Sequence, residues 1–192
     1  AWRPGARWEL EGGLRFNRFD SDETFHDIAP RLALKHRLTD TINLRASTGV
    51  YYQYLHRIPR FIATDIWIAS NKDLDPSRAI HAIVGYQQEL RNNFQLEVEA
   101  YWKGYEEIYE FNQTFLTKLQ ETSHDEEGNP VFTNAKGIFN NGDGQSIGLE
   151  MMLRKDSGAL TGWAAYSIAR TEYGFDGING NRDFTPRHDR TH

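Results

Sequence analysis

Apolar and polar side chains alternate at every second position through most of this sequence, and this pattern limits the possible folds more than any other feature. A period of two residues is typical of a β-strand whose two faces meet different surroundings. The stretches that show it are about ten residues long, whereas an ordinary soluble strand has about five or six. Seven stretches begin at Trp8, Pro30, Ile42, Ile80, Phe94, Ile147 and Leu160.

The connections between these stretches alternate in length. Tight turns are predicted at residues 39–41, 91–93 and 156–159, and long links at residues 55–77, 112–144 and 175–187. The link at residues 20–27 is intermediate in length. Up-and-down membrane barrels have this arrangement, with short turns on the periplasmic side and longer loops outside.

The parity of the apolar positions sets the expected register, because a slip of one residue would move a whole apolar face to the wrong side of the sheet. At the first tight turn, Leu38 should face Ile42 across a three-residue loop. At the second turn, Leu90 should face Phe94. At the third turn the apolar positions change from odd-numbered to even-numbered residues, so the loop must hold an even number of residues. The four residues at 156–159 satisfy this requirement. All three turns are compatible with one continuous apolar surface.

The alternation alone is compatible with a soluble β-sandwich, which points apolar residues into a core, and with a membrane barrel, which points them into lipid. Strand length and loop asymmetry favour the barrel. Trp8 and Phe94 lie near the short-turn ends, and Tyr52 and Trp102 near the long-loop ends, where aromatic girdles are expected. The predicted fold is therefore all-β, an antiparallel up-and-down transmembrane β-barrel segment of about seven or eight strands.

The polar faces of the predicted strands carry separate groups of opposite charge. The second and third strands carry the basic residues Arg31, Lys35, Arg37 and Arg45, and the fourth and fifth carry the acidic residues Glu89, Glu97 and Glu99. Such charges suit a watery or plugged lumen, and they also suit a solvated sheet face. Within the fifth strand, Gly104 marks either a bulge or a small residue beneath a neighbouring side chain.

Composition excludes several classes of protein. The formal net charge of −5 argues against a nucleic-acid partner, because nucleic-acid binders carry a basic stripe. No apolar run approaches the roughly 20 residues that a membrane helix needs. The sequence has no cysteine, which removes disulfides, cysteine–zinc sites and thiol catalysis.

No motif points to catalysis, and we expect no enzymatic activity, no catalytic residue, no cofactor and no metal site. Glu97 and Glu99 share a face, but nothing marks them as an acid–base pair. The Gly142-Asp143-Gly144 segment lacks the strand-then-helix context of a phosphate loop. The acidic loop at residues 124–130 does not have the spacing of a calcium loop and is interpreted as a hairpin turn.

Several strings, in order along the chain, resemble strands of the barrel of TonB-dependent receptors. They are GLRFNRF at residues 13–19, PRLAL at 30–34, LTDTINLRAS at 38–47, the segment from Asn71 to Tyr86, GDGQSIGLE at 142–150, and RHDRTH at 187–192. In the last string, His188 stands where the family's strand has a tyrosine. The resemblance covers nearly the whole chain.

This resemblance implies a barrel of about 22 strands around a plug. We therefore expect residues 1–192 to be a partial barrel domain, a fragment from which the plug domain and the C-terminal strands are absent. The implied function is TonB-energised uptake of a scarce nutrient, such as a siderophore, cobalamin or an oligosaccharide, across the outer membrane of a Gram-negative cell. The implied partners are outer-membrane lipid, the plug domain, TonB and the small-molecule nutrient.

Two other functions stay open at this point: a passive porin or adhesin barrel, and a soluble β-sandwich module that binds carbohydrate. For the receptor, ligand contacts are expected at the strand tops and in the long loops. There Tyr54, Arg57, Trp67 and Tyr105 offer aromatic and cationic groups. This expectation depends on their position in the sequence, and packing between the loops would explain the same residues.

Overall fold

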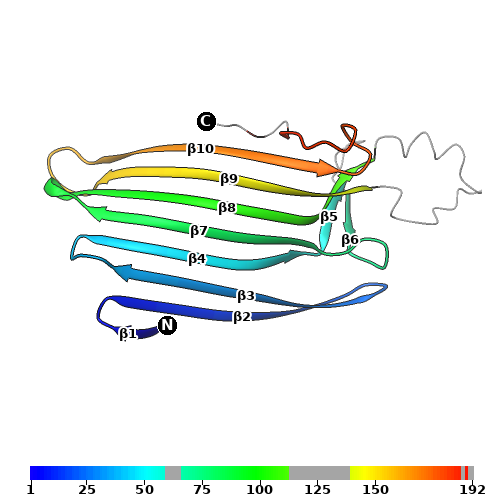
Figure 1. The fold of residues 1–192 in the computed structure, drawn as a ribbon, viewed down its shortest axis with the longest axis horizontal. Helices are drawn as coiled ribbons and strands as arrows, with labels where there is room; N and C mark the ends of the chain where they lie inside the picture. Colours follow the sequence, from blue (N-terminus) through cyan, green and yellow to red (C-terminus); the bar gives the residue numbers. More distant parts are fainter. Residues whose placement is uncertain (59–65, 113–138, 187–188, 190–192) are drawn as a thin grey trace, which may run out of the picture.

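The computed structural model describes residues 1–58, 66–112, 139–186 and 189. Eight strands form one antiparallel sheet in the order β1-β2-β3-β4-β7-β8-β9-β10, and two more, β5 and β6, form a separate hairpin (Figure 1). The strands are β1 (Trp2–Gly5), β2 (Trp8–Asp20), β3 (Thr24–Arg37), β4 (Ile42–Gln53), β5 (Leu55–Ile58), β6 (Ile66–Ala69), β7 (Ser77–Glu89), β8 (Phe94–Phe111), β9 (Phe139–Lys155) and β10 (Gly162–Phe175).

Strands of the large sheet lie side by side in chain order, except that the β5–β6 hairpin is inserted between β4 and β7. This confirms the predicted all-β, up-and-down arrangement. The sheet is a barrel segment and does not close on itself within the described residues (Figure 1). Among those residues, no helix is long and apolar enough to cross a membrane.

The first two tight turns have the predicted register. The Leu38 amide donates to the Ile42 carbonyl at 2.9 Å, and the Leu90 amide donates to the Phe94 carbonyl at 2.7 Å. The third turn is longer than predicted, because Lys155 pairs with Gly162 and residues 156–161 form the loop. Its length is still even, as one continuous apolar face requires.

Two features at the ends of the sheet differ from the prediction. The strand β1 pairs with β2 and was not predicted, because four residues are too short to show a period of two. The connection between β2 and β3 holds only residues 21–23, so it is a tight turn rather than an intermediate link. The strand predicted to begin at Arg187 lies almost entirely outside the described residues.

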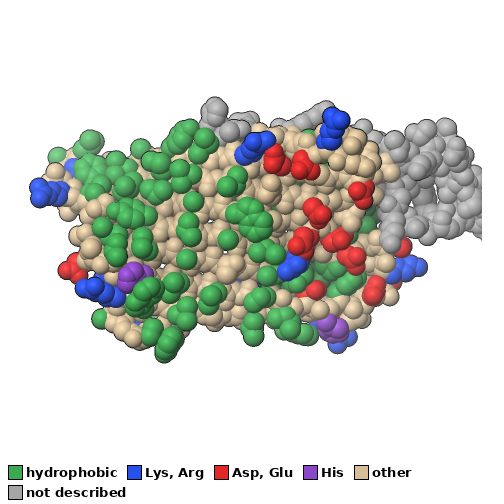
Figure 2. Space-filling view, in the orientation of Figure 1, with side chains coloured by type: hydrophobic (Ala, Val, Ile, Leu, Met, Phe, Trp, Pro, Cys, Tyr) green, Lys and Arg blue, Asp and Glu red, His purple; other side chains and the backbone are tan. Residues whose placement is uncertain are grey.

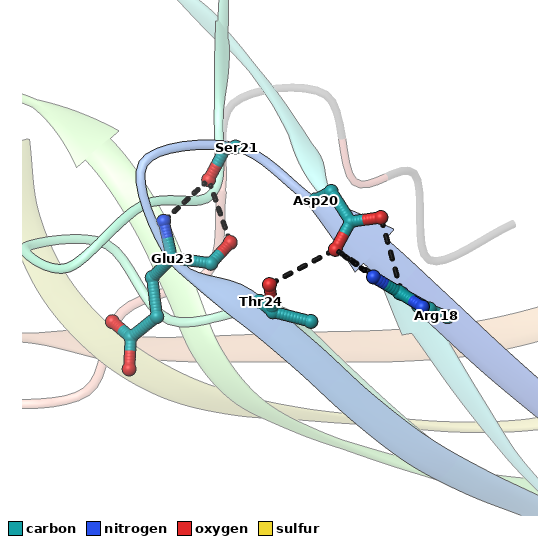
Figure 3. Close-up of polar contacts among 5 residues, drawn as sticks. All are labelled: Arg18, Asp20, Ser21, Glu23 and Thr24. Atoms are coloured by element: carbon teal, nitrogen blue, oxygen red, sulfur yellow. Dashed lines mark hydrogen bonds and ion pairs between the residues drawn. The ribbon is translucent and has the colours of Figure 1, made fainter.

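Polar contacts close the turn between β2 and β3 (Figure 3). Asp20 accepts a hydrogen bond from the Thr24 hydroxyl at 2.9 Å and forms an ion pair with Arg18 at 3.1 Å. Ser21 donates from its hydroxyl to the Glu23 carbonyl at 3.2 Å. The pairing of β2 with β3 therefore continues beyond Phe16 as far as Asp20 and Thr24. The alternation of apolar residues ends at Phe16, so it did not predict this part of the two strands.

One face of the sheet is apolar and uncovered (Figure 2). On it, Val84 is 59% exposed, Met151 is 42% exposed and Leu44 is 37% exposed. No second layer of described residues packs against this face, so the described segment is not one half of a filled sandwich core. Hydrophobic side chains cover its turn end and middle, and carboxylates gather near the loop end (Figure 2).

Glycines on β8 and β9 make room for aromatic side chains. A Cβ at Gly148 would lie 2.5 Å from the ring of Tyr101 on the neighbouring strand. A Cβ at Gly104 would lie 2.6 Å from the Trp102 indole, so Gly104 is the small residue beneath a neighbour rather than a bulge. The bulge of β8 comes later, between Tyr105 and Ile108.

Candidate ligand-binding surface

The β5–β6 hairpin carries two of the residues predicted to contact a ligand. Arg57 on β5 lies directly opposite Trp67 on β6. Arg57 is exposed and Trp67 is 55% exposed, so both side chains are available to a ligand that approaches from solution.

Beside the hairpin, the sheet contains a hollow of about 420 Å³ that brings aromatic and cationic groups together. Arg57 and Tyr105, both predicted from sequence, line it. Tyr51, Tyr52 and Tyr109 also line it, and none of the three was predicted from sequence as a ligand contact. The structure therefore brings two of the four predicted residues together at this hollow and adds three tyrosines to them.

Tyr54 lies elsewhere and fixes the loop. Its hydroxyl donates to Asp27 Oδ2 at 2.8 Å, and its ring stacks on Phe19 with centroids 4.8 Å apart. Burial raises the pKa of the Tyr54 hydroxyl well above its ordinary value, and the carboxylate of Asp27 raises it further. In this arrangement Tyr54 ties the start of the long loop to the β2–β3 hairpin and does not line the hollow.

His56 is a buried residue of this surface that sequence reasoning missed. It is 5% exposed, its Nε2 lies 2.9 Å from the Ser70 hydroxyl, and its ring meets Tyr109 edge-on at 4.6 Å. Burial lowers the pKa of His56 to about 4, so the ring is neutral at neutral pH. The Ser21 hydroxyl donates to the Ser70 carbonyl at 2.7 Å, which ties the β2–β3 turn to the same loop.

A second hollow, of about 560 Å³, lies at the loop end between β8, β9 and β10 and is rich in carboxylates. Glu106, Asp143, Glu172 and Asp183 are among its lining residues. No group of three or more His, Asp or Glu side chains in the described part of the chain is placed to hold a metal ion. The acidic loop at 124–130, considered above for calcium, lies outside the described residues.

Comparison with protein families decides where this sheet belongs. The family model described as TonB dependent receptor-like, beta-barrel, matches residues 1–189. The chain belongs to this family. The TonB-dependent receptors are outer-membrane receptors and transporters rather than enzymes, and in full-length members the barrel works together with a plug and TonB. A search of curated proteins found no match.

Membership of the TonB-dependent receptors confirms the resemblance drawn from the sequence. The spacing of glycines in one of the strings that carried it follows from the packing just described. In the 142–150 string, Gly144 and Gly148 are the positions where a Cβ would meet the rings of Tyr173 and Tyr101. Small residues are needed there because aromatic side chains from the neighbouring strands occupy that space.

Proposed function

We propose that this segment forms part of a receptor that takes up a scarce nutrient across the Gram-negative outer membrane with energy delivered through TonB. The family match over residues 1–189 carries the proposal. The uncovered apolar face supports it, because a barrel wall in lipid exposes its apolar side chains outward and encloses its polar ones. The polar face of the sheet then faces the barrel lumen.

The ligand contacts that we propose lie at the loop end, at Arg57, Trp67 and Tyr105. Tyr54 is proposed to act on the same site by holding the start of the loop that carries Arg57. Arg57, Tyr51 and Tyr105 line one hollow, which combines a guanidinium with flat aromatic surfaces. A guanidinium binds carboxylate or phosphate oxygens in pairs, and tyrosine rings stack on flat or sugar-like surfaces. The hollow therefore suits a ligand that is anionic and has an extended flat face.

Uptake of candidate nutrients by cells that express the complete receptor tests this function. We expect uptake that disappears when TonB is deleted, because a TonB-energised receptor depends on it. A passive porin or adhesin barrel, the alternative function, would be unaffected by that deletion.

Alanine substitutions test the site. We expect Arg57→Ala and Tyr105→Ala to weaken ligand binding and uptake, and Arg57→Lys to recover part of the loss because it keeps the charge but not the paired geometry. Tyr166 on β10 is 57% exposed on the apolar face, far from the hollow, so Tyr166→Ala is the matched control. Unchanged uptake in the Arg57 and Tyr105 variants would show that these two residues are not part of the ligand site.

A further inference from the structure

One row of residues on the polar face of the sheet gathers basic side chains. Strand pairing places Arg31 on β3 directly opposite Gly49 on β4, and Gly49 opposite His81 on β7. It then places His81 opposite Lys103 on β8. We call these four residues the basic row. Lys103 is an even number of residues from Glu99 along β8, so the basic row lies on the polar face of the sheet.

The glycine of the basic row brings Arg31 and Tyr51 together. A Cβ at Gly49 would lie 3.3 Å from the Arg31 side chain and 3.2 Å from the Tyr51 hydroxyl, so both side chains lean over the glycine. The Arg31 guanidinium lies 5.0 Å from the centre of the Tyr51 ring, and the His81 ring lies 4.5 Å from it. A guanidinium held over an aromatic ring keeps its N–H donors in its own plane, where they can reach an oxyanion.

The two permanent charges of the basic row contact aromatic rings instead of carboxylates. Among the described residues, neither Arg31 nor Lys103 forms an ion pair. The Lys103 ammonium lies 4.6 Å from the centre of the Tyr101 ring, much as Arg31 lies over Tyr51. A ring attracts a cation through its quadrupole and has no net charge, so these contacts do not neutralise either cation. The row therefore presents uncompensated positive charge on the polar face.

A hollow of about 390 Å³ lies on the basic row and adjoins the hollow at the loop end. Its lining residues include Arg31, Gly49, Tyr51 and His81, and Glu11 is the single carboxylate among those that the structure describes. Tyr51 also lines the hollow of about 420 Å³ that contains Arg57. Gly49 comes two residues before Tyr51 on β4, so the basic row lies about 7 Å further from the loop end. The two hollows therefore follow one another along the polar face and share one tyrosine.

We propose that the hollow on the basic row is a second binding site for the anionic group of the transported ligand, deeper in the lumen than the Arg57 hollow and joined to it by Tyr51. The proposal rests on the proposed function, which places the polar face in the lumen. Arg31 binds a pair of carboxylate or phosphate oxygens, and Lys103 adds attraction from a neighbouring strand. Because Tyr51 borders both hollows, the ligand keeps one contact while it passes from the first site to the second.

Charge decides which class of ligand the second site accepts. A cationic ligand would be repelled by Arg31 and Lys103, and a neutral sugar could stack on Tyr51 but would leave both charges uncompensated. An anionic group compensates them and accepts hydrogen bonds from the guanidinium at the same time. A free anion from the medium has the same chemistry as the anionic group of the nutrient, and the experiment below separates these two sources.

Equilibrium dialysis of radiolabelled inorganic phosphate against the purified complete receptor measures the site, with Arg57→Ala present throughout to remove the arginine of the first hollow. We expect Arg31→Gln to weaken phosphate binding about tenfold, because a charge-assisted hydrogen bond is lost. Glu11→Gln should strengthen it about threefold, because a neighbouring negative charge is removed. Arg154→Gln is the matched control, since Arg154 lies near the turn end of the polar face and pairs with Asp156. Equal phosphate binding in Arg31→Gln and Arg154→Gln would overturn the proposal.

A pair of glycine variants tests the geometry of the site without changing any charge. Gly49 and Gly13 lie opposite Arg31 on its two sides, but a Cβ at Gly13 would have nothing within 4 Å. We expect Gly49→Ala to weaken phosphate binding about threefold, because the added methyl group pushes the side chains of Arg31 and Tyr51 apart. Gly13→Ala, the matched control, should bind phosphate like the parent. Equal binding in the two glycine variants would overturn the assignment of the site to this hollow.

Displacement of the bound phosphate separates the transported ligand from a free anion. We expect the candidate nutrient that shows TonB-dependent uptake to displace phosphate from the Arg57→Ala receptor. Phosphate that this nutrient does not displace would mark a site for a free anion and overturn the proposal. TonB-dependent uptake by the parent receptor, together with no bound phosphate, refutes the second site alone. Absence of TonB-dependent uptake in the parent refutes the proposed function itself.

Discussion

Two adjacent methionines on β9 point to opposite faces of the sheet. Substituting arginine at each position in turn, and comparing the two losses of stability, tests which face meets lipid. Met151 lies between Val98 and Tyr166 on the apolar face, and Met152 lies between Glu97 and Ala165 on the polar face. The two substitutions remove the same side chain and add the same charge. The difference between them therefore isolates the surroundings of each face.

The free-energy cost of Met151→Arg depends on how deep Met151 lies in the apolar band of the sheet. It lies opposite Val98, the third of five apolar-face positions between Phe94 and Trp102, so it is near the middle of the apolar band. Arginine at the midplane of a barrel's lipid face costs about 2–4 kcal/mol. At position 152 the new arginine would lie opposite Glu97, an arrangement that contributes about 0.2–1 kcal/mol of stabilisation.

We expect Met151→Arg to lower the folding equilibrium constant of the complete barrel about 40- to 5,000-fold relative to Met152→Arg, because the cost at position 151 and the gain at position 152 add in the difference. Urea titration of the barrel in lipid vesicles measures both free energies of unfolding. Equal free energies for the two variants, or a larger loss for Met152→Arg, would refute the assignment of the faces.

Three further predictions concern packing and the loop end. Gly148→Val should lower the free energy of unfolding by about 1–3 kcal/mol, because a Cβ there would meet the ring of Tyr101 at 2.5 Å. Gly12→Val is the control: a Cβ at Gly12 has nothing within 4 Å, so this variant should be neutral in the same urea titration. Tyr54→Phe should destabilise the loop by about 1 kcal/mol through loss of its hydrogen bond to Asp27. A double-mutant cycle with Asp27→Ala, read by limited proteolysis, should show coupling between the two positions, and additive effects would count against the bond. The pKa of His56 is about 4 in the folded chain and about 6.5 when unfolded, so below pH 6.5 the unfolded state binds the proton more tightly. The contribution of the neutral His56 to the stability of the β5–β6 hairpin is therefore complete above about pH 6.5 and is lost as the pH falls toward 4. Hydrogen exchange of the hairpin, corrected for intrinsic rates, should show this loss of stability, and constant protection would contradict it.

The large sheet could be predicted from sequence because its faces meet different surroundings. In β8, Val98 and Glu99 must point to opposite sides, and this requirement fixes strand, register and turn parity together. The pattern disappears where both faces meet water. For this reason it missed the extension of β2 from Arg18 to the turn and the exact length of the third tight turn.

The candidate site could be predicted only in part, because its geometry depends on contacts between distant segments. Arg57 and Tyr105 were singled out for their position near the strand tops, and the fold places both at one hollow. His56 could not be found in this way, since its burial depends on Ser70 and Tyr109 from other elements.

The surroundings of consecutive residues along β8 show most directly whether the apolar face of the sheet meets lipid. The described segment has no native cysteine, so single cysteines introduced from Leu96 to Trp102 can each carry a fluorophore in the complete receptor in vesicles. We predict that a quencher attached to lipid chains acts at 96, 98, 100 and 102, and that a water-soluble quencher acts at the positions between them. Lipid quenching at Glu97 and Glu99, or no alternation at all, would show that the apolar face of the sheet does not meet lipid.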